Sequence, residues 1–224
     1  CSATISFVTA QAASTPNVII IMADDQGYQD LGCFGSPNIK TPHIDRMAKE
    51  GMRFTDFYSG ASVCTPSRAA LLTGSYASRA GNLGVLFPRD KRGLNPDEIT
   101  IAEVLKTKGY ATACIGKWHL GHLKEFLPTN QGFDTYFGVP YSNDMTIDAT
   151  QPLANDVVLR EGVTLENIKN RVRKNLVPLM RDTEIIEYPA DQNTLTKRYT
   201  EEAIAFIKKN KEKPFFIYLP HTMP

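Results

Sequence analysis

Short apolar runs alternate with helix-like patterns along this chain, and no other feature of the sequence restricts its fold as strongly. Runs with the length and composition of strands occupy 18–23, 53–58, 110–115, 133–139 and 215–219. Patterns typical of helices occupy 42–49, 67–73, 100–108, which Thr100 is expected to cap, and 196–210. The 145–193 region is polar and irregular, with one charged helix-like stretch at 166–175. Strands that follow one another through helices form parallel crossover units, and a continuous apolar run such as 18–23 predicts a strand buried on both faces. The sequence therefore predicts an α/β fold, a three-layer sandwich with a mostly parallel central sheet.

Polar side chains of the types used in catalysis and metal binding come directly after three of the predicted strands. Asp24 and Asp25 follow the first run, Lys117 and His119 follow the third, and His221 follows the last. The carboxyl ends of parallel strands meet at one edge of a sheet, where α/β proteins bind their ligands. We therefore expect these side chains to share one site.

The stretch Cys64–Gly74 combines a cysteine with proline, serine and arginine before an apolar helix. Pro66 fits the first turn of a helix, so that Thr65 or Cys64 is expected to cap it. The Cys64 side chain then lies beside the positive end of the helix dipole, and Arg68 at i+4 can reach the same place. Such a place suits an oxyanion ester.

The neighbouring carboxylates Asp24 and Asp25 need a cation or good hydrogen bonds. Oxygen ligands favour a hard divalent ion, Ca²⁺ or Mg²⁺. The alternative is a pair of loop-capping aspartates, because aspartate is common in turns.

Lys117 and His119 alternate at a strand end, which sends both side chains in the same direction. The lysine offers a fixed positive charge, and the histidine can exchange a proton near neutral pH. The alternative is a surface lysine beside a structural histidine.

Two motifs, Cys64–Gly74 and Gly109–His119, together with 17–58, 132–144 and 213–224, resemble the type I, formylglycine-dependent sulfatases, especially the arylsulfatase A-like branch. The resemblance implies an alkaline phosphatase-like fold. It also implies that Cys64 is converted to formylglycine by a maturation enzyme, so that the hydrated aldehyde becomes the nucleophile. Asp24, Asp25 and position 64 would then bind the metal, calcium in this family.

The same resemblance assigns the remaining candidates. Lys117 and His119 would hold the formylglycine hydrate, and Arg68 would neutralise charge around it. His221 would contact the sulfate and protonate the leaving oxygen. Ser142 matches a serine of the family's substrate pocket. His43 and His122 have no matching role and are interpreted as loop or packing residues.

The resemblance thus predicts a sulfuric ester hydrolase that acts on an aryl, carbohydrate or sulfolipid sulfate. One alternative is a phosphonate or phosphodiester hydrolase of the same superfamily. Another is a non-catalytic glycan-binding relative in which Cys64 stays unmodified.

The composition sets outer limits on function. A net charge of +1 produces no electrostatic field that would attract nucleic acid. Four cysteines are too few for a disulfide framework, although a Cys33–Cys64 disulfide is an alternative for Cys64. Residues 1–15 are interpreted as the remnant of a secretory signal or a lipoprotein start, which predicts a periplasmic or secreted protein without a transmembrane span. We interpret 16–224 as the N-terminal portion of a catalytic domain, truncated at its C-terminus, and 145–193 as a substrate-side insertion.

Overall fold

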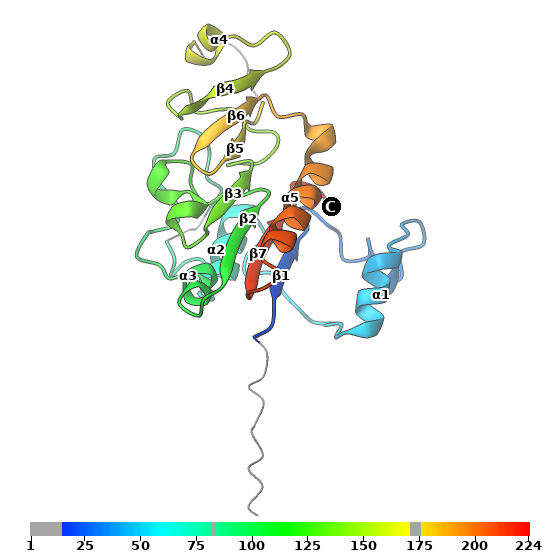
Figure 1. The fold of residues 1–224 in the computed structure, drawn as a ribbon. Helices are drawn as coiled ribbons and strands as arrows, with labels where there is room; N and C mark the ends of the chain where they lie inside the picture. Colours follow the sequence, from blue (N-terminus) through cyan, green and yellow to red (C-terminus); the bar gives the residue numbers. More distant parts are fainter. Residues whose placement is uncertain (1–14, 82–83, 171–175) are drawn as a thin grey trace, which may run out of the picture.

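A computed structural model describes residues 15–81, 84–170 and 176–224. One seven-stranded sheet runs through these residues in the order β1-β7-β2-β3-β5-β6-β4 (Figure 1). The strands are β1 (Val18–Met22), β2 (Ala111–Ile115), β3 (Thr135–Gly138), β4 (Leu153–Leu159), β5 (Leu179–Arg181), β6 (Glu184–Tyr188) and β7 (Phe215–Pro220). The interpretation of 1–14 as a processed N-terminus lies outside the described residues.

The half of the sheet that carries the candidate residues is parallel, as predicted. β7 pairs with β1 on one side and with β2 on the other, and β2 pairs with β3, always in parallel. The carboxyl ends of these strands therefore meet at one edge. β5 runs antiparallel to both β3 and β6, while β4 and β6 are parallel, so the sheet is mostly parallel.

Helices cover both faces of the parallel strands, which confirms the three-layer sandwich. α5 (Leu195–Lys209) lies over one face, and α2 (Cys64–Thr73) and α3 (Ile101–Lys106) lie over the other (Figure 1). Neighbouring residues of β7 alternate between the two cores. Phe216 packs with the α2 and α3 side, whereas Ile217 packs with the α5 side. Alternate residues of a strand point to opposite faces, so a strand covered on both faces is apolar throughout.

The predicted helix at 100–108 begins as expected. The Thr100 hydroxyl accepts from the Glu103 N–H while the Glu103 carboxylate accepts from the Thr100 N–H, which is a complete capping box. The other helical elements are α1 (Pro42–Glu50), α4 (Leu165–Lys169) and the 3-10 helices η1 (Gly32–Phe34), η2 (Lys124–Phe126), η3 (Pro128–Asn130) and η4 (Gln192–Thr194).

Two predictions about the first sixty residues are wrong. β1 is not buried on both faces: it is an edge strand that pairs only with β7, and Ile19 and Ile21 are 45% and 59% exposed. The 53–58 segment forms no strand, because no neighbouring strand among the described residues supplies the hydrogen-bond partners that a strand needs. α1 packs on η1 and stands apart from the sheet (Figure 1).

The 145–193 region is more regular than its polar composition indicated. It contributes β4, β5 and β6 to the sheet, and α4 covers the start of the predicted helix at 166–175. The end of that helix, 171–175, lies outside the described residues. No helix in the described ranges is long and apolar enough to cross a bilayer.

Candidate active site

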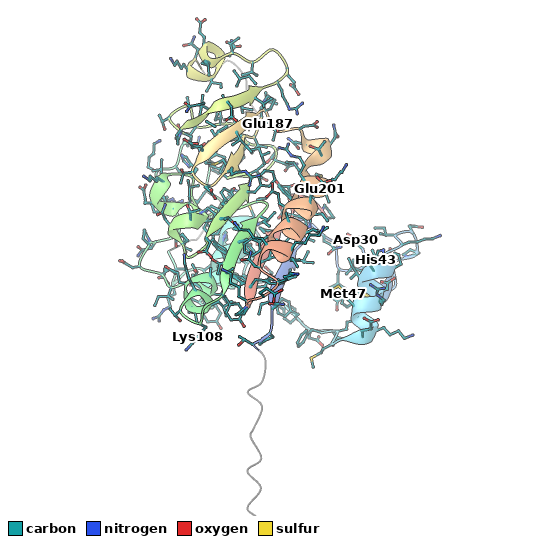
Figure 2. The ribbon with its side chains drawn as sticks, viewed as in Figure 1. Asp30, His43, Met47, Lys108, Glu187 and Glu201 are labelled. Atoms are coloured by element: carbon teal, nitrogen blue, oxygen red, sulfur yellow. The ribbon has the colours of Figure 1, made fainter. Side chains whose placement is uncertain are left out.

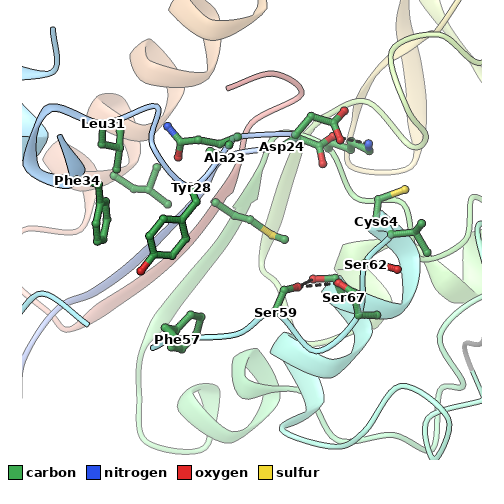
Figure 3. Close-up of a pocket in the computed structure, with 18 of the residues that line it drawn as sticks. Ala23, Asp24, Tyr28, Leu31, Phe34, Phe57, Ser59, Ser62, Cys64 and Ser67 are labelled. Carbon is green, nitrogen blue, oxygen red and sulfur yellow. Dashed lines mark hydrogen bonds and ion pairs between the residues drawn. The ribbon is translucent and has the colours of Figure 1, made fainter. Parts of the chain in front are cut away.

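A pocket of about 730 Å³ lies at the carboxyl ends of β1 and β2, beside the N-terminus of α2 (Figure 3). Its walls include five of the predicted residues: Asp24, Asp25, Cys64, Lys117 and Ser142. Of the five side chains that the strand-end argument placed in one site, Asp24, Asp25 and Lys117 line this pocket, whereas His119 and His221 do not.

Gly116 explains how Lys117 reaches this edge. Its backbone has φ +130°, and a Cβ there would overlap the carbonyl oxygen of Pro220 on β7. That carbonyl accepts from the Lys117 N–H at 2.8 Å. Only glycine allows this close crossing, so the chain turns from β2 directly into the pocket.

Cys64 is the first residue of α2, and Val63 is the N-cap. The expectation that Thr65 or Cys64 caps the helix is therefore wrong, and Val63 offers no side-chain acceptor. Pro66 does lie in the first turn, as predicted. Cys64 is a half-buried free thiol, so the Cys33–Cys64 disulfide is excluded, because Cys33 is free as well.

Asp24 is held between two buried cations. Its Oδ2 accepts from the Lys117 ammonium at 2.5 Å, and its Oδ1 lies 3.4 Å from Nη2 of Arg68. The Lys117 and Arg68 side chains are 2% and 0% exposed. Arg68 does not line the pocket but lies behind it, where it donates to the Lys117 carbonyl at 2.6 Å. Arg68 therefore acts on the pocket through Asp24 and the Lys117 backbone.

The Lys117 ammonium also donates to the Ser142 hydroxyl at 3.1 Å. It is therefore fixed between a carboxylate and a hydroxyl, both of which face the pocket. Such a lysine is neither a surface residue nor free to rotate, which excludes the structural alternative for this position.

His119 is fully buried and adopts φ +56°, which is uncommon for a residue other than glycine. Its Nε2 lies 2.8 Å from the Leu86 carbonyl oxygen. Because a carbonyl can only accept, Nε2 carries the proton and Nδ1 keeps its lone pair. Within the described part of the chain, Nδ1 has no hydrogen-bond partner. Burial, reinforced by the Lys117 cation, lowers the pKa of His119 to about 4, so the ring is neutral at neutral pH and can accept a proton.

His221 is not brought into the pocket. Its backbone N–H donates to the Met22 carbonyl at 2.8 Å, and its ring lies 6.2 Å from the ring of Tyr199 on α5. Burial lowers the pKa of His221. His43 is exposed on α1 (Figure 2), so its interpretation as a loop or packing residue is wrong.

Sequence reasoning missed the contacts that hold this site together. The Thr65 hydroxyl donates to the His119 carbonyl at 3.0 Å and accepts from the Leu86 N–H at 3.2 Å. Opposite Cys64, the pocket wall is aromatic at Tyr28, Phe34 and Phe57 (Figure 3). Phe54 also lines the pocket. Neither feature carries a local signal, because each depends on segments that only the fold brings together.

Asp24 and Asp25 are the residues that could hold a cation. Carboxylate oxygens suit Ca²⁺ or Mg²⁺, which take six or more oxygen ligands. Among the described residues there is no cluster of three or more His, Cys, Asp or Glu side chains. The two aspartates therefore fit one part of a hard-cation site, and Lys117 and Arg68 hold the Asp24 carboxylate at its place in the pocket.

A family model described as Sulfatase matches residues 16–223. Arylsulfatase G of Mus musculus is 41% identical over 213 residues, which cover 92% of this chain and 41% of that protein. Arylsulfatase A of Bos taurus is 42% identical over 212 residues, which cover 92% of this chain and 41% of that protein. The chain thus spans less than half the length of these relatives.

Two solved structures also resemble this chain over most of its length. The crystal structure of Ps i-CgsB in complex with k-i-k-neocarrahexaose superimposes with a TM-score of 0.76 at 33% identity, covering 93% of this chain and 45% of that one. The structure of PsFucS1 sulfatase from Pseudoalteromonas sp. superimposes with a TM-score of 0.71 at 30% identity, covering 92% of this chain and 44% of that one.

Proposed function

This chain belongs to the sulfatase family, and on that premise we propose that the protein hydrolyses sulfate monoesters through a formylglycine formed at Cys64. One observation carries the proposal. Cys64, at the N-terminus of α2, lines the same pocket as Asp24, Asp25 and Lys117. Helix N-termini favour anions, and Lys117 adds a fixed positive charge. A sulfate group therefore finds its nucleophile and its counter-charges in one place.

Asp24, Asp25 and position 64 would hold the divalent cation, Ca²⁺ or Mg²⁺. When bound, the cation would polarise the sulfate oxygens, and the formylglycine hydrate would supply the attacking oxygen. Among the chain's own residues, Lys117 would bind a sulfate oxygen, with Ser142 fixing the ammonium. Arg68 would balance charge from behind the pocket, because it is already committed to Asp24 and the Lys117 carbonyl.

His119 is the base that we propose. Its pKa of about 4 makes it a weaker base than an ordinary histidine. Its ring is neutral at neutral pH, and Nδ1 is the nitrogen left to accept a hydroxyl proton. We propose His221 as the group that protonates the leaving oxygen. Its side chain is not part of the pocket wall. Because its pKa is lowered, a smaller fraction of His221 carries a proton at neutral pH than of an exposed histidine.

The substrate proposed is a sulfated small molecule or glycan. The Ps i-CgsB structure is of a complex with a carrageenan-type oligosaccharide, which supports the glycan. We also propose a formylglycine-generating enzyme as the maturation partner and a periplasmic or secreted location. We propose that 16–224 is the N-terminal portion of the catalytic domain and that 145–193 shapes the substrate side.

The test begins with mass analysis of the peptide that contains position 64, after co-expression with a formylglycine-generating enzyme. An aldehyde is expected, and a thiol would favour a glycan-binding protein. Aryl sulfate and phosphonate monoester turnover are then measured side by side. Cys64→Ala should abolish turnover. Cys33→Ala, which removes another free thiol outside the pocket, should not. Faster turnover of the phosphonate would refute the sulfatase assignment.

A further inference from the structure

Asp148 is a buried carboxylate outside the pocket that joins three segments of the chain. It is 5% exposed. Its Oδ2 accepts from the Lys91 ammonium at 2.9 Å and lies 2.8 Å from Nε2 of His122. Its Oδ1 accepts from the N–H and the hydroxyl of Thr150 at 2.9 and 2.8 Å. Burial alone would raise the pKa of Asp148, but these donors hold it well below its ordinary value, so Asp148 is charged at every working pH.

The first of these segments, 86–94, also forms a hydrogen bond to His119, the candidate base. At one end, the Leu86 carbonyl fixes the tautomer of His119. In the middle, the Phe87 N–H donates to the Asp90 carboxylate at 2.7 Å, and the Asp90 N–H donates to the Phe87 carbonyl at 2.9 Å. This closed turn makes the segment a stiff connection between Leu86 and Lys91. Fixing Lys91 on Asp148 therefore also restricts where the Leu86 carbonyl can lie.

The second and third segments connect Asp148 to the opposite side of the site. His122 follows His119 by three residues, and its ring lies 5.0 Å from the ring of Tyr141. Tyr141 precedes Ser142, which binds the Lys117 ammonium. The segment that carries Ser142 also carries Asp148 itself. One carboxylate thus joins the segments that present Leu86, His119 and Ser142.

We propose that Asp148 is a positioning residue, which with Lys91 and His122 clamps these three segments so that His119 and Ser142 keep their places around the pocket. The proposal rests on the proposed function for its catalytic consequence, but the clamp is a physical property that can be measured without turnover. His122 is accordingly a positioning group rather than a packing residue. The clamp predicts that weakening Asp148 affects kcat more than KM, because His119 and Ser142 shift while the Lys117 ammonium stays paired with Asp24 in the pocket.

The experiment uses the matured, metal-loaded enzyme and three variants. Asp148→Asn removes the charge but keeps the shape, and Lys91→Gln removes the cation. Arg92→Gln is the matched control, because Arg92 is an exposed cation in the same segment with no ion pair to a described residue. Backbone hydrogen exchange is followed over 86–94, 119–122 and 141–150, together with kcat, KM and the thermal unfolding midpoint.

In Asp148→Asn, we expect faster exchange confined to these three segments and a fall in kcat of about 10-fold to 100-fold at nearly constant KM. Lys91→Gln should give a smaller change of the same kind, and Arg92→Gln none. Exchange and kcat indistinguishable from Arg92→Gln would overturn the clamp, and so would faster exchange throughout the chain. If the wild-type protein turns over no sulfate ester, the proposed function fails, while the exchange pattern still decides the clamp.

Discussion

Thr65 offers a sharp test of how the nucleophile and the candidate base are held together. Its hydroxyl is fully buried, donates to the His119 carbonyl and accepts from the Leu86 N–H. Thr65→Val replaces the hydroxyl with a methyl group of similar size, so both backbone groups lose their partner without a change of volume. Thr65→Ser keeps both hydrogen bonds and is the matched control. Position 65 is the variable position of C-x-P-S-R, so maturation of Cys64 should proceed in both variants.

The magnitude follows from the two groups left without partners. A buried polar group without a hydrogen bond costs about 1–3 kcal/mol. The bond lengths of 3.0 and 3.2 Å lie towards the long end of the normal range. We therefore take the lower part of this energy range for each of the two groups. The free energy of unfolding should fall by about 2–4 kcal/mol in Thr65→Val. Thr65→Ser loses one buried methyl group, which costs about 1 kcal/mol.

Urea unfolding with linear extrapolation measures both values, and each kcal/mol should lower the thermal midpoint by about 2–4 °C. Because the lost contacts also orient His119, kcat should fall about 10-fold to 100-fold in Thr65→Val. Equal stability and equal kcat in Thr65→Val and Thr65→Ser would refute the reasoning, since the two variants differ in these hydrogen bonds.

Three other predictions concern charge and exposure. The pKa of His119 is about 4 in the folded protein, against an ordinary value of 6.5, so the unfolded chain binds the proton more tightly. The contribution of His119 to the unfolding free energy should fall by about 3 kcal/mol from pH 7 to pH 4, and a pH slope unchanged in His119→Gln would contradict this. Lys117→Met should lower kcat about 10²-fold to 10³-fold. Lys108→Met, on the exposed surface (Figure 2), should leave kcat unchanged. Equal losses of kcat in the two variants would contradict a role of Lys117 in the active site. Phe54 and Phe57 are 62% and 72% exposed, so changing both to Ser should lower binding of an apolar dye without lowering the thermal midpoint, and undiminished dye binding would contradict an accessible apolar patch.

Features with a short-range cause could be predicted from the sequence. Thr100 caps its helix as expected, because the cap and the N–H group that it accepts from lie within one helical turn. The apolar run at 215–219 forms β7, which is covered on both faces. Parallel strands end at one edge of a sheet, so side chains that follow different strands meet there. This rule needs only the strand order along the chain, and it brings together Asp24, Asp25 and Lys117.

Other features depend on what lies beside a segment. The run at 18–23 is as apolar as that of β7, yet β1 is an edge strand with one face exposed, because burial is a property of neighbours and not of the run itself. The 53–58 segment has no partner strand in the part of the chain that the structure describes, and it forms no strand. The polar 145–193 region forms strands because β3 offers an edge on which β5 can pair.

The sequence by itself determined the fold class and the residues that reach the strand ends, because hydrophobic periodicity and chain order are local properties. Only the tertiary structure decided which atoms of those residues are used. It buried Arg68 behind the pocket, left His221 outside it, and fixed the proton of His119 on Nε2 through the Leu86 carbonyl. Hydrogen bonds between segments far apart in the chain depend on distances of a few tenths of an ångström, and no spacing in a sequence specifies these.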